Sequence, residues 1–272
     1  MRLLPSPPSA GQSPLGIKPP APSWHNRTAR AARWRARKLC CSAVSFGPPA
    51  EPDLKRVLAE GRVVARRRLP ISTRSSRAIE VVTLQGGVEA FWKRGDVDPP
   101  GLAGVRREVA AYELASILGW HDLLQVTVLR REMTEAGTQV EVAAIELLAE
   151  GVDDLAPTAF PRTQVERAGV FDAVIANIDR MGHNWRGLPD GEGGFQLKLY
   201  DHELAFGIGG SGEVCSSFWS AISESVPVHL RSTLVNAAAA VREAPYLEQL
   251  LGRESHQALV GRLVSLAGPA GA

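Results

Sequence analysis

Three polar residues in the second half of the chain have the types and the spacing that phosphoryl transfer uses. Asp179 precedes Asn184 by five positions, and a second acid, Asp201, follows a short run with strand character. In phosphoryl transfer from ATP, one carboxylate orients the attacking hydroxyl, while an amide oxygen and another carboxylate hold Mg²⁺ against the phosphates. The three residues are therefore candidates for this chemistry, with ATP and Mg²⁺ as the ligands.

Asp179 lies where a helix would deliver it to a loop. Apolar Phe171, Val174 and Ile175 recur at i, i+3 and i+4, which predicts a helix over 162–177. The catalytic loop of protein kinases spaces its base and its metal-binding Asn in the same way as this pair. The context therefore favours a catalytic loop directly after the helix.

Asp201 is predicted to end a strand. The segment 187–194 is rich in Gly, Pro and Asp and predicts a turn, and residues 195–200 then alternate apolar and polar side chains. A carboxylate at a strand end can face a bound metal. The alternative is that Asp179 and Asp201 only cap turns, which is the usual use of a lone Asp.

Lys93 is conspicuous because the chain has 26 Arg but only five Lys. It lies in the β-prone run 88–95, which follows a turn at 86–87 and has 79–84 as its predicted hairpin partner. A lysine ammonium is a compact charge that can reach the α and β phosphates, and the wider Arg fork is not equivalent. The alternative is a solvated strand lysine, of which Lys198 is the expected example.

Kinases pair such a lysine with an acid on the next helix. Apolar periodicity predicts a helix over 104–118 with Gly119 as its stop, and Glu108 lies in its first half. A single acid on an amphipathic helix is usually solvated. A pairing role for Glu108 therefore needs further support.

The segment before Lys93 lacks the G-x-G-x-x-G motif of ordinary protein kinases. In its place, residues 71–77 are rich in Ser and Arg. Hydroxyls and backbone amides of such a loop, with Ser75 as the candidate, can cradle phosphate. Equally, this composition is that of an exposed linker.

Two more strands are predicted over 125–130 and 140–148. The segment from 146 to 151 would then be a hinge whose backbone meets adenine, with Glu146 as a candidate contact. After Gly151 the pattern is mostly helical, with further helices expected over 229–242 and 255–267.

The motifs IANIDRMGHNW and LYDHELAF, together with VEAFWKRG and RREVAAYELASILGW upstream, carry a family resemblance. Over roughly residues 70–210 the chain resembles the HipA-like kinases, a bacterial branch of the protein-kinase-like superfamily. Its catalytic loop is also similar to that of bacterial phosphatidylinositol 3/4-kinase-like proteins. One departure is that these families usually have His two positions after the catalytic Asp, where this chain has Met181.

The resemblance implies roles for the candidates. Asp179 would be the catalytic base, Asn184 and Asp201 the Mg²⁺ ligands, and Lys93 the phosphate-binding lysine held by Glu108. The implied function is an ATP- and Mg²⁺-dependent kinase, with a protein Ser/Thr hydroxyl as the favoured acceptor. Two alternatives stay open: a catalytically weak nucleotide-binding pseudokinase, and a lipid or small-molecule kinase.

The expected fold class is α+β, a bilobal protein-kinase-like fold with a strand-rich N-lobe over 51–148 and a helical C-lobe over 149–272. Residues 1–50 differ in kind, because they hold eight basic and no acidic residues, against 23 basic and 29 acidic in the rest. We expect a disordered basic extension there, with an organelle transit segment, or nucleic-acid binding through 24–38, as the alternatives. No run approaches membrane-spanning length and no secretory signal is evident. The three cysteines form neither a disulfide framework nor a metal-binding pattern, which fits a reducing, cytoplasmic location.

Overall fold

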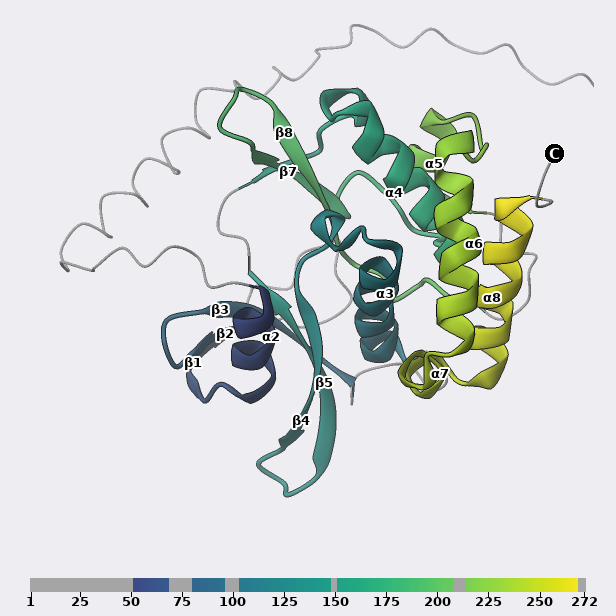
Figure 1. The fold of residues 1–272 in the computed structure, drawn as a ribbon. Coiled ribbons are helices and arrows are strands. Elements are labelled where there is room, and N and C mark those ends of the chain that lie inside the picture. The colour runs from purple at the N-terminus through teal and green to yellow at the C-terminus, as the bar shows by residue number, and fades with distance from the viewer. Residues whose placement is uncertain (1–50, 69–79, 96–102, 148–150, 208–213, 269–272) are drawn as a thin grey trace, which may run out of the picture. The chain divides into compact units, whose positions relative to one another are not determined.

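An antiparallel five-stranded sheet forms much of the first half of the computed structural model, which describes residues 51–68, 80–95, 103–147, 151–207 and 214–268. The helix α2 precedes the first strand. The elements are α2 (Glu51–Glu60), β1 (Val63–Arg68), β2 (Glu80–Leu84), β3 (Glu89–Arg94), β4 (Thr127–Met133) and β5 (Gln139–Glu146). The strands are ordered β1-β2-β3-β5-β4, so that β3 lies in the middle of the sheet (Figure 1).

The predicted hairpin around the glycine pair is confirmed. Gly86 and Gly87 adopt φ values of 96° and 86°, in the left-handed region that glycine enters at no steric cost. They join β2 to β3, whose register pairs Glu80 with Trp92. On its other side β3 pairs with β5, and this register sets Lys93 opposite Ala143.

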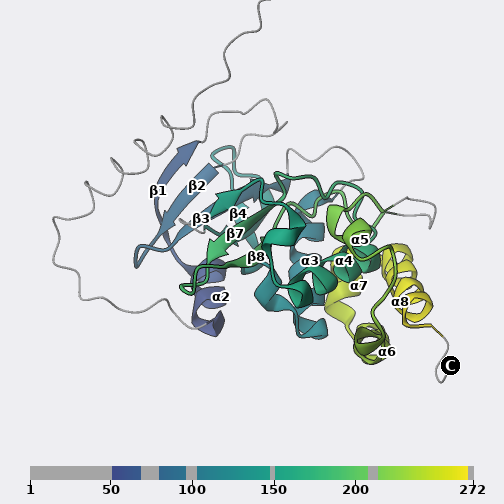
Figure 2. The same ribbon diagram turned by 90° about the horizontal axis from the view of Figure 1, so that it is seen from above.

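Helix α3 (Gly104–Leu118) has the predicted bounds. It ends at Gly119, whose φ of 71° allows its N–H to reach the carbonyls of Ala115 and Ser116. Both views place α3 between the five-stranded sheet and the C-terminal helices (Figures 1 and 2). Its buried positions therefore face neighbours on more than one side.

A second, small sheet follows the first. It contains β6 (Val152–Asp153), β7 (Trp185–Pro189) and β8 (Phe195–Leu199), in that order. The prediction of a turn over 187–194 is wrong for its first three residues, which belong to β7. Gly187 fits there because a Cβ would lie 2.5 Å from Cδ1 of Leu155, and Pro189 lies at the strand end, beyond the two residues that pair with β6.

Helices make up most of the remaining chain. The helices predicted over 162–177, 229–242 and 255–267 are confirmed as α4 (Arg162–Ile175), α6 (Val228–Arg242) and α8 (Arg253–Ala267), with ends that differ by at most two residues. The structure adds four short helices that were not predicted: η2 (His121–Leu123), η3 (Pro157–Ala159), α5 (Ser217–Ala221) and α7 (Pro245–Leu251). The expected α+β arrangement, with a sheet-rich part and a helical part, is therefore present.

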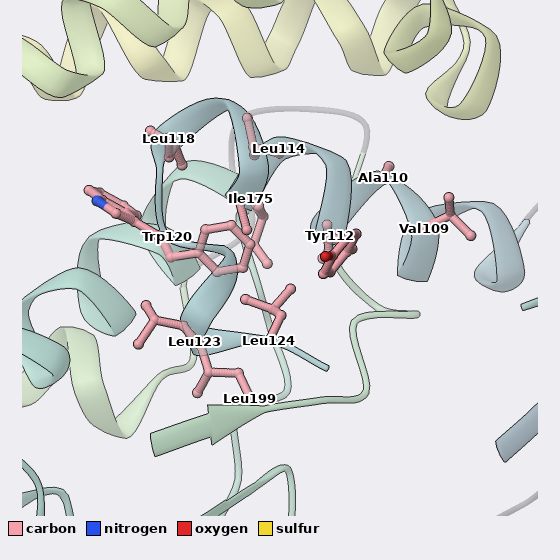
Figure 3. Packing of buried hydrophobic residues seen from close by; sticks show 14 of the residues in the cluster. Val109, Ala110, Tyr112, Leu114, Leu118, Trp120, Leu123, Leu124, Ile175 and Leu199 are labelled. Carbon is pink, nitrogen blue, oxygen red and sulfur yellow. The ribbon is translucent and has the colours of Figure 1, made fainter. Parts of the chain in front are cut away.

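One continuous apolar core joins the two parts. Leu114 and Leu118 of α3 gather near Ile175 of α4 (Figure 3). Below them, Leu124 forms a parallel bridge with Leu199 of β8. Each fully buried Leu or Ile contributes about 1.5–3 kcal/mol of hydrophobic stabilisation, so this packing fixes α3 and β8 relative to each other.

Charged side chains cover the buried Trp92 of β3. Arg66 of β1 contacts Glu132 of β4 at 3.0 Å, and the indole Nε1 of Trp92 donates to the same carboxylate at 2.9 Å. The guanidinium groups of Arg66 and Arg130 lie 5.8 Å and 5.0 Å from the Trp92 ring centroid. The two edge strands of the sheet are thus connected through side chains.

Several predictions fall outside the described residues. These are the basic extension at 1–50, the phosphate loop with Ser75, and residues 148–150 of the hinge. Among the helices that the structure describes, none combines the length and the apolar character needed to cross a membrane.

The packing of α4 against α5 generates a stability prediction. A Cβ on Gly169 would lie 2.7 Å from the carbonyl oxygen of Phe218, so Gly169→Ala must shift backbone. We expect a loss of about 1–3 kcal/mol in the free energy of unfolding, measured with urea. Gly261→Ala is the matched control, because a Cβ there meets nothing within 4 Å in the middle of α8. It should stabilise by about 0.5–1 kcal/mol, and equal effects of the two substitutions would contradict the close approach.

Candidate active site

Lys93 lies between two carboxylates that come from distant parts of the chain. Its Nζ donates to Oε1 of Glu108 on α3, and to Oδ1 of Asp201, after β8, at 2.9 Å. The Lys93 side chain is 14% exposed and that of Glu108 is 3% exposed, so the prediction of a solvated lysine fails for Lys93. Three of the sequence candidates therefore meet at one point.

Burial and charge act in opposite directions on this cluster. Burial alone would lower the pKa of Lys93, but the carboxylates of Glu108, Asp201 and Glu203 outweigh it and raise the pKa above its ordinary value. Burial alone would raise the pKa of Glu108, but Lys93 and His202 lower it well below its usual range. At neutral pH Lys93 is therefore an ammonium ion and Glu108 a carboxylate.

The backbone directs Asp201 toward the lysine. Its φ of 61° lies in the left-handed region, which Asp tolerates better than most residues other than glycine. The side chain is 36% exposed. One oxygen of Asp201 is thus held by Lys93, while the carboxylate keeps access to solvent.

The predicted catalytic loop is held together by amide side chains. Asn177 accepts from the backbone N–H of Asp179 at 3.0 Å. The Nδ2 of Asn184 donates to the backbone oxygen of Asp179 at 2.6 Å and lies 3.4 Å from its carboxylate Oδ2. The structure therefore brings Asp179 and Asn184 into contact, with Asn184 buried and Asp179 partly exposed.

A fully buried ion pair anchors this loop to α4. Arg180 and Asp172 are both 0% exposed, and the guanidinium Nε and Nη2 donate to the carboxylate at 3.0–3.2 Å. Asp172 also accepts from Asn177 Nδ2 at 3.1 Å and from Ser216 Oγ at 2.7 Å. A charge buried this deeply is tolerated only when it is paired and hydrogen-bonded, and here both conditions hold.

The same arginine connects the loop to the segment that carries Asp201. Its Nη1 donates to the backbone oxygens of Asn184 at 2.7 Å and of Tyr200 at 2.6 Å. The N–H of Tyr200 in turn donates to the carbonyl of Asn184 at 3.1 Å. The two backbone segments that carry the predicted metal ligands, Asn184 and Asp201, are therefore held next to each other.

Asp172 and Arg180 are not among the site residues predicted from the sequence. Asp172 gave a signal, since it is a charged residue inside the apolar run that predicts α4, and such a residue needs a buried partner. Arg180 directly follows the predicted base, but no spacing rule identifies it as the partner. His202 directly follows Asp201, and its Nδ1 lies 3.3 Å from Oε2 of Glu108.

Glu146 and Lys198, which the sequence also singles out, have partners outside the Lys93 cluster. Glu146 ends β5, three residues after the partner of Lys93, and its Oε2 accepts from the N–H of Val126 at 3.4 Å. Lys198 is not the solvated lysine expected from the sequence. Its Nζ donates to the carbonyl of Leu124 at 3.2 Å, and burial lowers the pKa of Lys198.

The donor set fits a metal that arrives with a nucleotide. Within the described ranges, no three His, Cys, Asp or Glu side chains cluster as a ready-made metal site. Asn184 and Asp201 supply an amide and a carboxylate. Mg²⁺ in phosphoryl-transfer sites commonly takes one or two protein ligands and fills its shell with substrate phosphates and water.

Comparison with known proteins identifies the fold. No protein-family model and no curated protein matches the chain. A crystal structure of the Golgi casein kinase with Mn and ADP bound aligns with a TM-score of 0.56 and 14% identity, over 80% of this chain and 74% of that chain. A second Golgi casein kinase structure gives 0.56 and 13% over the same shares.

The Helicobacter pylori proinflammatory kinase CtkA aligns more loosely, at a TM-score of 0.44 with 11% identity, over 77% of this chain and 96% of that chain. The casein kinase alignments, at their low identity, show the fold alone. The chain has a protein-kinase-like α+β fold.

The buried ion pair generates a second prediction. Arg180→Lys keeps the charge but loses the fork that reaches Asp172 and two carbonyls together, so we expect a loss of about 3 kcal/mol or more in the free energy of unfolding. Arg162→Lys is the matched control, because that side chain is 84% exposed and pairs with Glu166 only one helical turn away. Its effect should stay within about 0.5 kcal/mol. Equal unfolding free energies for wild type and Arg180→Lys would contradict the proposed anchor.

Proposed function

We propose that the chain is an ATP- and Mg²⁺-dependent phosphotransferase of the HipA-like kind, which transfers a phosphoryl group to a hydroxyl. The observation that carries the proposal is the contact of Lys93 with both Glu108 and Asp201, within a kinase-like fold. The Golgi casein kinase structure with Mn and ADP bound supports a nucleotide and a divalent metal as ligands of this fold. The division into lobes at residue 148 and the cytoplasmic location stay predictions.

Lys93 would neutralise nucleotide phosphates. Its raised pKa keeps the ammonium charged throughout the physiological range. Glu108 holds the amine from α3, so the lysine approaches the phosphates from a fixed direction rather than as a flexible side chain. A fixed charge stabilises the transition state without reorganisation during the reaction.

Asn184 and Asp201 would hold Mg²⁺, which neutralises the developing charge on the phosphates when it is bound. Arg180 contacts the backbone at Asn184 and at Tyr200, so the spacing of the two donors is set before any ligand arrives. This preorganisation reduces the entropy lost on binding.

Asp179 would orient the acceptor hydroxyl and accept its proton as the bond to phosphorus forms. Its backbone is fixed by Asn177 and Asn184, while its side chain remains partly exposed. An acceptor can therefore approach the carboxylate from solvent.

A protein Ser or Thr is the acceptor that we favour. The resemblance to HipA-like kinases supports a protein substrate. Ile178 and Met181, which flank Asp179, are 47% and 44% exposed. Apolar side chains beside the base suit a peptide with apolar neighbours better than the polar headgroup of an inositol lipid.

A second candidate function is a nucleotide-binding pseudokinase. Met181 stands where the resembling families usually have His, and methionine has no proton to exchange.

Incubation of the purified chain with labelled ATP and Mg²⁺ separates the two candidate functions. Label transfer to the chain itself or to a Ser/Thr peptide supports the kinase. Thermal stabilisation by ATP without turnover supports the pseudokinase, and transfer only to lipid or small-molecule hydroxyls supports those acceptors.

The role of Asp179 generates a third prediction. Asp179→Asn keeps the shape and the contact with Asn184 but removes the charge that matters during transfer. We expect the rate to fall by about 10²–10⁴-fold, while ATP affinity changes by less than about threefold. The measurement is initial-rate transfer to the best acceptor, with calorimetric titration of ATP. Thermal melting checks that the variant is folded. Transfer at the wild-type rate by Asp179→Asn would contradict the assignment of Asp179 as the catalytic base.

The proposed role of Asp201 as a metal ligand generates a fourth prediction. Asp201→Ala should abolish the gain in nucleotide affinity that Mg²⁺ provides, because a metal ligand acts on the bound nucleotide as well as on the transition state. Calorimetric titrations of ADP with and without Mg²⁺ measure this gain. Asp53→Ala, which removes an exposed carboxylate on α2, is the control for charge loss and should keep the gain. An unchanged Mg²⁺ dependence in Asp201→Ala would contradict the ligand role.

A further inference from the structure

His202 is a buried residue that contacts Glu108 at the carboxylate oxygen that Lys93 does not bind. Its side chain is 3% exposed, and its Nδ1 lies 3.3 Å from Oε2 of Glu108. Its ring packs edge-on against Phe171 of α4, with 6.0 Å between ring centroids. The residue follows Asp201 directly, so it links the segment of a predicted metal ligand to α3.

The chemistry of the two groups fixes the direction of this hydrogen bond. Glu108 is ionised, since its neighbours lower its pKa, and an ionised carboxylate can only accept. The Nδ1 of His202 must therefore carry the proton. Within the described chain, Nε2 is buried without a hydrogen-bond partner, so the hydrogen bond of the ring goes to Glu108.

The two oxygens of Glu108 consequently have separate partners. Lys93 binds Oε1 and His202 faces Oε2. A carboxylate held at one oxygen can still rotate about its terminal torsion, which has a broad energy profile. A donor at the second oxygen removes this freedom and fixes the position at which the lysine amine is held.

We propose that His202 is a positioning residue, whose Nδ1–H orients Glu108 so that Lys93 is directed at the nucleotide phosphates. The expected effect on turnover rests on the proposed function. The orientation of Glu108 rests only on its contacts with Lys93 and His202. A buried imidazole with one unsatisfied nitrogen is costly compared with an apolar ring. The hydrogen bond to Glu108 gives a reason for its presence that packing against Phe171 does not.

The tautomer of His202 tests the geometry without any need for activity. Two-bond ¹⁵N–¹H spectra of histidine-labelled protein distinguish Nδ1–H from Nε2–H, and the spectrum of His202→Asn identifies the His202 signal. We expect the Nδ1–H form for His202. His256 is the internal reference, because its Nε2 lies 2.8 Å from the carbonyl of Val241 and must carry its proton on that nitrogen. An Nε2–H form for His202 would overturn the proposal.

Two substitutions separate positioning from packing. His202→Asn places an amide donor near the position of Nδ1 but loses the ring, whereas His202→Phe keeps a ring against Phe171 and loses the donor. We expect His202→Phe to melt close to wild type but to lose at least about tenfold in kcat, as outer residues that orient functional groups commonly do. His202→Asn should melt lower, because it leaves a cavity, yet keep kcat within about threefold.

The opposite ranking would overturn the proposal. A purely structural His202 predicts that activity follows stability, so that the Phe variant would be the more active of the two. If wild type shows no turnover, the proposed function fails, and acylation of Lys93 with Lys55 as the reference replaces kcat. Faster acylation of Lys93 in His202→Phe, but not in His202→Asn, then supports the positioning role, and equal rates in both variants overturn it.

Discussion

The buried contact between Arg180 and Asp172 is the interaction on which the candidate site depends. Both side chains are excluded from water, so each is tolerable only because the other neutralises it. The guanidinium also donates hydrogen bonds to two backbone carbonyls from different segments. A single planar group therefore fixes α4, the loop after it and the end of β8 as one unit. This explains why an arginine, with its rigid fork, occupies a position that a lysine could match in charge only.

Three carboxylates act on one lysine in the site. Glu108, Asp201 and Glu203 all act on Lys93, and they keep it charged despite its burial. Such an arrangement suits an incoming polyanion only if further positive charge accompanies it, because the carboxylates would otherwise repel the phosphates. In the proposed function, a divalent cation that binds with the nucleotide would supply this charge.

Local patterns predicted the elements more reliably than the contacts between them. The bounds of α3 follow from apolar periodicity and a glycine stop, and the β2–β3 hairpin follows from Gly86 and Gly87, because both signals are local in sequence. Lys93, Glu108 and Asp201 could be chosen as candidates, but their meeting depends on the packing of α3 against the five-stranded sheet and on the bridge from Leu124 to β8. Composition misled at β7, where Gly187 and Pro189 read as a turn while Leu155 and the short β6 make them acceptable in a strand. The prediction for Lys198 was wrong because its ammonium group donates a hydrogen bond to a carbonyl in the segment before β4, a contact that no local pattern encodes.

The contact between Arg66 and Glu132 has a consequence for the shape of the five-stranded sheet. β1 and β4 are its opposite edges, and four interstrand steps of about 4.8 Å would hold them about 19 Å apart if the sheet were flat. A 3.0 Å contact between side chains from these edges requires the sheet to roll around Trp92 toward a half-barrel. The roll is closed by an ionic bridge instead of a sixth strand, so its curvature depends on charge as well as on hydrogen-bonded backbone.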